Sequence, residues 1–104
     1  MNHFTDLPGW NAIRSQLVWQ FKAAKPPADH PFGAYFTTLE SDEPNLATKL
    51  RIPREKLGYL FSFKECEPTD LSPLPGGRGR FIFFSPKDYA VEETRQLRSG
   101  ETNL

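Results

Sequence analysis

Three short runs of aromatic and β-branched residues constrain the fold of this chain more than any other feature. They are residues 33–39 (GAYFTTL), 57–64 (LGYLFSFK) and 80–84 (RFIFF). Aromatic and β-branched side chains favour strands, so each run is predicted to form one. The second run alternates along its length, and the third is apolar throughout, which is typical of strands in the middle of a sheet.

Weaker patterns predict three more strands and two short helices. The additional strands are residues 1–5, which resemble a sheet edge, residues 19–23 and residues 89–97. Asp6 is suited to cap a helix of two to three turns on which Trp10, Ile13 and Leu17 share a face. Pro44 opens a second helix, which ends before Pro53. Residues 25–32 (KPPADHPF) and 65–79 are rich in proline or glycine and are predicted to be loops.

Length and composition predict one small, β-rich α+β domain that spans residues 1–104. This length matches one domain, and Cys66 is the only cysteine, so no internal disulfide forms. Thirteen Lys and Arg balance thirteen Asp and Glu, so overall charge gives no case for a nucleic-acid or membrane partner. No apolar run approaches the ~20 residues that span a bilayer, and no export signal is evident, so a cytoplasmic site of action is expected.

Common enzyme motifs are absent from the sequence. Two histidines and one cysteine, without metal-binding spacing, predict no metal site. GGRG lies between a proline-rich loop and a strand, which is the wrong context for a dinucleotide-binding turn, and there is no Walker loop or GxSxG elbow.

Four residues on two predicted strands are the candidates for a site. His3 and Thr5 share one face of the first strand, and Gly33 and Tyr35 begin a later one. Each also has an ordinary structural interpretation: polar residues near a terminus usually face water, and a tyrosine commonly packs at a core edge with its hydroxyl outward.

The order of these segments resembles that of a known family. HFTD, a short helix containing AIRSQ, and then FGAYFTTL resemble the front half of ADP-ribosyltransferases. The stretch from HFTD through NLATKLRIPREKLGYLFSF to GGRGRFIFFSPKDY is similar to the HYD-signature ADP-ribosyltransferase domains of bacterial polymorphic toxins. The resemblance covers most of the chain, and it implies a small, split, twisted sheet with NAD in the cleft.

The resemblance also implies roles for the four candidates. His3 would hydrogen-bond the ribose on the nicotinamide side, and Thr5 would line the same strand. Gly33 would let the backbone approach the nicotinamide amide, and Tyr35 would stack on the nicotinamide ring. The reaction would transfer ADP-ribose from NAD to a macromolecular acceptor, or hydrolyse NAD, without a metal. A cognate immunity or antitoxin protein, and delivery as a secreted toxin module, would fit this class.

The catalytic acid is where the chain departs from the family pattern. Poly-ADP-ribose-polymerase-like enzymes carry a Glu just ahead of the strand that here reads FIFF, and this chain has Arg80 there. Glu92 is the preferred substitute, with Glu93 and Glu101 as alternatives. Arg80 is expected to clamp the NAD pyrophosphate or to mark a relative that acts on RNA.

Two interpretations other than an enzyme stay open. A binding module of the same fold would recognise a protein, nucleotide or nucleic acid through the 65–79 loop and a basic run that contains Lys49, Arg51, Arg54 and Lys56. That run is also typical of a solvated helix face. A small inhibitor protein whose only function is an interface is the third possibility.

Overall fold

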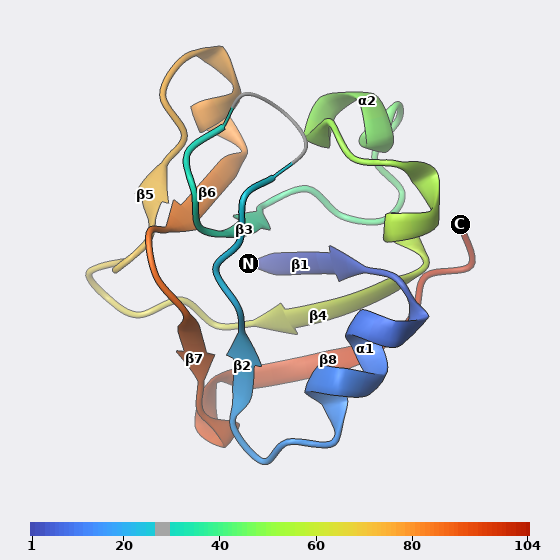
Figure 1. The fold of residues 1–104 in the computed structure, drawn as a ribbon, viewed down its shortest axis with the longest axis vertical. Helices are drawn as coiled ribbons and strands as arrows, with labels where there is room; N and C mark the ends of the chain where they lie inside the picture. The colour runs from blue at the N-terminus through green and yellow to red at the C-terminus, as the bar shows by residue number, and fades with distance from the viewer. Residues whose placement is uncertain (27–29) are drawn as a thin grey trace.

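The computed structural model describes residues 1–26 and 30–104, and it contains two antiparallel sheets (Figure 1). The larger sheet has the strand order β5-β6-β3-β1-β4-β8, and the smaller one pairs β2 with β7. The strands of the larger sheet are β1 (Asn2–Thr5), β3 (Ala34–Thr37), β4 (Tyr59–Phe63), β5 (Ser72–Pro73), β6 (Ile82–Ser85) and β8 (Gln96–Glu101). Those of the smaller sheet are β2 (Trp19–Phe21) and β7 (Tyr89–Val91).

Two α-helices and three 3₁₀ turns connect these strands. They are α1 (Leu7–Arg14), α2 (Leu46–Leu50), η1 (Arg54–Leu57), η2 (Gly77–Arg80) and η3 (Glu93–Arg95). The Asp6 carboxylate accepts the Gly9 N–H at 2.9 Å, which confirms Asp6 as the N-cap of α1. The predicted α+β class is confirmed at this coarse level.

The position of β1 differs from the prediction of an edge-like strand. β1 pairs with β4 at four positions and with β3 at one, so it lies inside the sheet. The terminal amine of Met1 also donates to the Phe63 carbonyl at 2.9 Å. Strand neighbours are set by contacts distant in sequence, which a polar N-terminal pattern does not reveal.

The C-terminal third of the chain has more turns than the sequence predicts. Residues 89–97 are not one strand: β7 ends at Val91, the chain turns through η3, and β8 begins at Gln96. The Arg95 N–H bonds the Glu92 carbonyl at 2.9 Å and closes that turn. The predicted 65–79 loop contains β5 and most of η2, so the following strand, β6, begins at Ile82 rather than Arg80.

Aromatic packing between the two sheets forms the main core. Phe21 of β2 meets Phe36 and Phe61 of the larger sheet edge-to-face, with ring centroids 5.3 and 5.6 Å apart. Trp19 is buried against Phe61, whereas Trp10 is partly buried and stacks on Tyr59. A second cluster lies under α2 and η1, and consists of Phe4, Leu46, Leu57 and Leu60. The pocket described next lies between these clusters, at β1 and β3.

Candidate functional site

The sheet is split between its two middle strands. β1 and β3 share one backbone pair, Asn2 with Thr37, whereas β1 makes four pairs with β4 and β3 makes four with β6. Beyond that pair, a side chain bridges the strands: His3 Nδ1 bonds the Tyr35 carbonyl at 2.9 Å. The missing ladder leaves room for a pocket.

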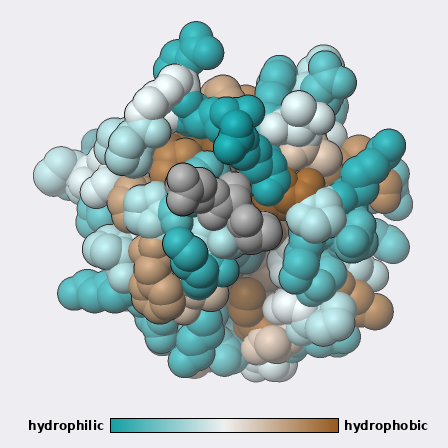
Figure 2. Space-filling model, turned by 45° about the horizontal axis from the view of Figure 1, so that its top comes forward, coloured by the Kyte–Doolittle hydropathy of each residue, from teal (hydrophilic) through white to brown (hydrophobic). Residues whose placement is uncertain are grey.

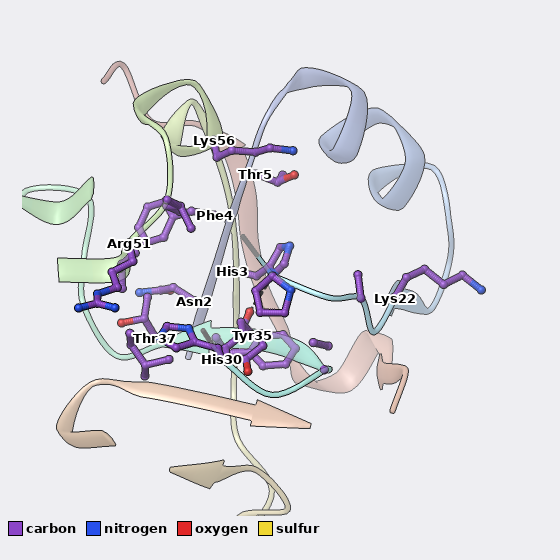
Figure 3. A pocket seen from close by; sticks show the side chains of 18 of the residues that line it. Asn2, His3, Phe4, Thr5, Lys22, His30, Tyr35, Thr37, Arg51 and Lys56 are labelled. Carbon is purple, nitrogen blue, oxygen red and sulfur yellow. Dashed lines mark hydrogen bonds between the residues drawn. The ribbon is translucent and has the colours of Figure 1, made fainter. Parts of the chain in front are cut away.

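A pocket of about 310 Å³ opens at this split. All four residues of β1 and all four of β3 line it, together with parts of residues 22–26 and the segment from Leu50 to Pro53. Figure 3 shows the labelled side chains around this pocket, with Lys22 extending away from the others. Figure 2 shows apolar surface recessed among hydrophilic side chains on the face that carries α2. This volume lies at the lower end of the range for small-molecule sites.

The structure brings together four of the residues that the sequence selects. His3, Thr5, Gly33 and Tyr35 all line this pocket although 28 or more residues separate the two pairs in the chain. Thr5 and Gly33 are buried, and His3 and Tyr35 are partly exposed. The alternative that His3 and Thr5 simply face water does not describe this structure.

His3 is held as a neutral imidazole. A carbonyl oxygen only accepts hydrogen bonds, so Nδ1 carries the proton that it donates to Tyr35. The ring packs against Phe21 at a centroid distance of 4.7 Å, and this burial lowers the pKa of His3 below its ordinary 6.5. No described residue hydrogen-bonds Nε2, so this unprotonated nitrogen can accept a hydrogen bond from a hydroxyl of a ligand.

Tyr35 lies in a column of stacked rings. His30 covers one side at a centroid distance of 5.7 Å, and Phe84 covers the other at 5.6 Å. The Tyr35 hydroxyl donates to the Pro31 carbonyl. Phe84 belongs to the neighbouring strand β6, so a nicotinamide ring that stacks on Tyr35 must take the place of His30.

The backbone of Gly33 lies close to other segments of the protein, and not to an open position for a nicotinamide. Its N–H and carbonyl both pair with Ala24, each at 3.0 Å, so the main-chain groups expected to bind a nicotinamide amide are already engaged. A Cβ at this position would lie 2.5 Å from the Ser85 carbonyl oxygen. Glycine is therefore required here by packing between β3 and β6.

Gly33→Ala should destabilise the protein by about 1–3 kcal/mol, since the added methyl overpacks the start of β3. Chemical denaturation measures this loss. Gly77→Ala is the matched control, because a methyl added there would meet no atom within 4 Å, and it should change stability by less than about 0.5 kcal/mol. Equal effects of the two substitutions would contradict this packing at Gly33.

The described part of the lining carries positive charge only. It contains Lys22, Lys25, Arg51 and Lys56, and no Asp or Glu among the residues that the structure describes. Lys22 pairs with Asp88 at 3.5 Å, and Lys56 pairs with Asp6 at 3.0 Å. These two carboxylates therefore contact lining lysines without lining the pocket themselves. In a chain of zero net charge, this concentration of cations favours an anionic ligand.

The structure does not bring Glu92 or Arg80 to this pocket. β7 starts near Lys22, where Asp88 accepts the Ala23 N–H at 2.8 Å, and runs away from it, so that Val91 pairs with Trp19. Glu92 follows Val91 and is exposed, about 13 Å farther along the chain than Asp88 at ~3.3 Å per residue. Arg80 is exposed in η2, where its Nε donates to the Gly77 carbonyl at 3.1 Å.

The two alternative acids are also outside the lining. Glu93 is exposed in η3, and Glu101 is exposed at the end of β8, opposite Tyr59. The three glutamates lie at different places around the η3 turn: Glu92 precedes it, Glu93 begins it and Glu101 ends the strand that follows it. The sequence pattern predicts one strand over residues 89–97 and so does not reveal this turn.

Sequence reasoning missed Asn2 as a pocket residue. It is 1% exposed, and its Nδ2 donates to the Leu39 carbonyl and to the Glu40 carboxylate, each at 2.9 Å. The side-chain oxygen, Oδ1, is buried without a hydrogen-bond partner. A polar residue at the second position gives no signal of burial, because its neighbours come from segments more than 30 residues away.

Comparisons with known proteins assign no family to this chain: no family model, no curated protein and no solved structure matches it. Within residues 1–26 and 30–104, no group of three His, Cys, Asp or Glu side chains is placed to hold a metal ion. None of the described helices is long and apolar enough to cross a membrane.

Proposed function

We propose that this chain is an NAD-dependent mono-ADP-ribosyltransferase of the toxin or effector type, or an NAD glycohydrolase when water is the acceptor. The observation that carries the proposal is the pocket at the split between β1 and β3, where His3, Thr5, Gly33 and Tyr35 meet. The resemblance of the sequence to HYD-signature domains selects the same four residues independently of any structure.

The chemistry follows from the position of His3. The unprotonated Nε2 accepts a hydrogen bond from a hydroxyl of the nicotinamide-side ribose and so holds that ribose in place. The bond between ribose C1′ and the nicotinamide nitrogen then breaks, and neutral nicotinamide leaves with the bonding electrons. The acceptor or water forms the new bond to C1′ and releases its proton to solution.

Negative charge is needed to oppose the cation that develops on the ribose. In the described chain, Asp88 and Asp6 are the carboxylates ion-paired with lining residues. The Ala23 N–H is the main cause that lowers the pKa of Asp88, so this side chain is ionised at neutral pH. Asp6 also caps α1, which gives it a structural role of its own.

Asp88→Asn and Glu92→Gln separate the two sources of charge. We expect Asp88→Asn to lower the rate of nicotinamide release by roughly 10- to 100-fold, because it removes a charge at the Lys22 edge of the pocket. Glu92→Gln should keep the parent rate within about twofold, because Glu92 lies outside the lining. Release is followed by chromatography, with NAD affinity measured by calorimetry on both variants. A larger loss in Glu92→Gln would restore Glu92 as the acid.

A second function is favoured because every charged side chain in the described lining is Lys or Arg. A binding module that recognises a nucleotide or nucleic acid needs positive charge and no acid, which is what the described lining offers. Nucleic-acid binding that weakens steeply with salt, without nicotinamide release, would select this alternative. A macromolecular acceptor and an immunity protein are expected as partners only if the chain is the proposed enzyme.

A further inference from the structure

Arg51 occupies a backbone position that favours glycine. It ends α2 in the left-handed region, with φ 56° and ψ 43°. The Ile52 N–H bonds the Ala47 carbonyl at 3.2 Å and the Arg51 N–H bonds the Thr48 carbonyl at 3.3 Å, which is the Schellman pattern of helix ends. A strained non-glycine residue at such a position commonly marks a functional site.

The side chain of Arg51 is also the least engaged of the lining cations. Lys22 and Lys56 form ion pairs, and Lys25 Nζ lies 3.5 Å from the His30 carbonyl. Within the described residues, no hydrogen bond or ion pair involves the Arg51 guanidinium, although Arg51 lines the pocket. The helix end therefore presents a charged group that the fold itself does not use.

Asn2, which lines the same pocket, has a buried acceptor oxygen, Oδ1, without a hydrogen-bond partner among the described residues. Its amide nitrogen is fixed by Leu39 and Glu40, and Arg98 holds Glu40 through a 2.8 Å bond, so the amide cannot flip without breaking this chain of contacts. Thr37, its neighbour on β3, cannot help, because its hydroxyl donates to the Phe81 carbonyl. A buried carbonyl oxygen without a donor is costly, and a ligand N–H or O–H would remove that cost.

We infer that Arg51 and Asn2 form an anchor for a nucleoside diphosphate. The Arg51 guanidinium binds the pyrophosphate bidentately, and Asn2 Oδ1 accepts a ribose hydroxyl or base N–H of the same ligand. In Figure 3 the two side chains lie toward the same end of the pocket, with Lys22 toward the other. This inference deepens the proposed function. It rests on that function only for the statement that the ligand carries nicotinamide at its other end. It moves the pyrophosphate contact from Arg80 to Arg51.

ADP-ribose is the probe that tests the anchor, because it carries the diphosphate without nicotinamide. We expect Arg51→Gln and Arg51→Gly each to weaken ADP-ribose binding at least about tenfold in calorimetry, the loss typical of a removed charge-assisted contact. Arg54→Gln is the matched control, because Arg54 belongs to the same basic run but lies outside this pocket. The affinity of this variant for ADP-ribose should stay within about twofold of the parent's. Equal losses in Arg51→Gln and Arg54→Gln would overturn the anchor.

Two further readouts separate binding from folding. Arg51→Gly should raise the Tm while it weakens ADP-ribose binding, because glycine relieves the left-handed backbone strain. In the parent, the side-chain carbonyl resonance of Asn2 should shift on saturation with ADP-ribose. An unshifted resonance would overturn the role of Asn2, and a lowered Tm would contradict strain at Arg51.

The anchor and the proposed function fail in different ways. Arg51-dependent binding of ADP-ribose without any nicotinamide release from NAD would keep the anchor and reject the enzyme. Nicotinamide release that Arg51→Gln leaves unchanged would keep the enzyme and reject the anchor. Failure of the parent to bind ADP-ribose, with tight binding of an RNA oligonucleotide in its place, would also overturn the anchor.

Discussion

His3→Ala is expected to abolish NAD binding and nicotinamide release, with a loss of at least about 100-fold in rate. The substitution removes both the bridge from Nδ1 to the Tyr35 carbonyl and the free Nε2 in the pocket. Loss of a positioning contact at a reacting centre commonly costs this much. Chromatographic release assays and calorimetry on the purified variant measure it.

His3→Asn distinguishes the two nitrogens of His3. An asparagine amide keeps an N–H near the position of Nδ1, so the bridge to Tyr35 is retained, and it places nothing at Nε2. The variant should fold with nearly the parent Tm and still fail to bind NAD. Full NAD binding by His3→Asn would show that Nε2 does not contact the ligand.

The same histidine predicts a pH dependence of stability. Burial lowers the pKa of His3 in the folded state, so below about pH 6.5 the unfolded chain binds a proton that the folded protein does not. Its contribution to the free energy of unfolding therefore falls as the pH drops from about 6.5 to the lowered pKa, and levels off below it. His3→Asn should lose this part of the dependence in denaturation curves measured at several pH values.

Phe61→Ala is expected to have the largest effect on stability, a loss of about 3–5 kcal/mol. Phe61 is fully buried, meets Trp19 and Phe21 edge-to-face, and lies opposite His3 in the β1–β4 pairing. A domain of this size has a total stability of roughly 5–15 kcal/mol, so the Tm should fall by more than about 12 °C or folding should be lost.

Phe32→Ala is the matched control for Phe61→Ala. Phe32 is 55% exposed, so removing its ring should change stability by less than about 0.5 kcal/mol. Thermal denaturation of both variants under the same conditions provides the comparison. A core substitution that costs no more than this surface one would contradict the packing between the two sheets.

The sequence predicts most strands and helices of this fold because their signals are local. The aromatic runs that became β3, β4 and β6, and the Asp6 cap of α1, depend on neighbours a few residues away. The place of β1 inside the sheet could not be predicted, because its partners lie more than 30 residues away. The turn at η3 was missed because the alternation around Tyr89 and Val91 predicts a strand, although residues 92–96 (EETRQ) carry no apolar side chain to continue it.

The part of the candidate site that the sequence predicted also depends on local patterns. His3, Thr5, Gly33 and Tyr35 stand at strand positions that the family resemblance names, and the pairing of β1 with β3 brings them together. The pocket contacts made by a buried Asn2 follow from strand order, which no local pattern encodes.

The acid and the pyrophosphate contact show where local patterns mislead. Glu92 was selected by its distance after a strand, but the antiparallel pairing of β2 with β7 directs it away from the pocket. Arg80 was selected by its place before a strand that in fact starts two residues later, at Ile82. The strained backbone of Arg51 is a property of the helix end and is invisible in the sequence.

Release of nicotinamide from NAD is the measurement that tests the central claim most directly. The purified protein is incubated with NAD, alone and with cell lysate, and the free nicotinamide is quantified beside His3→Asn. The proposed function predicts release by the parent, increased by lysate when an acceptor is present, and none by the variant. No release under either condition, together with no NAD binding in calorimetry, would contradict it.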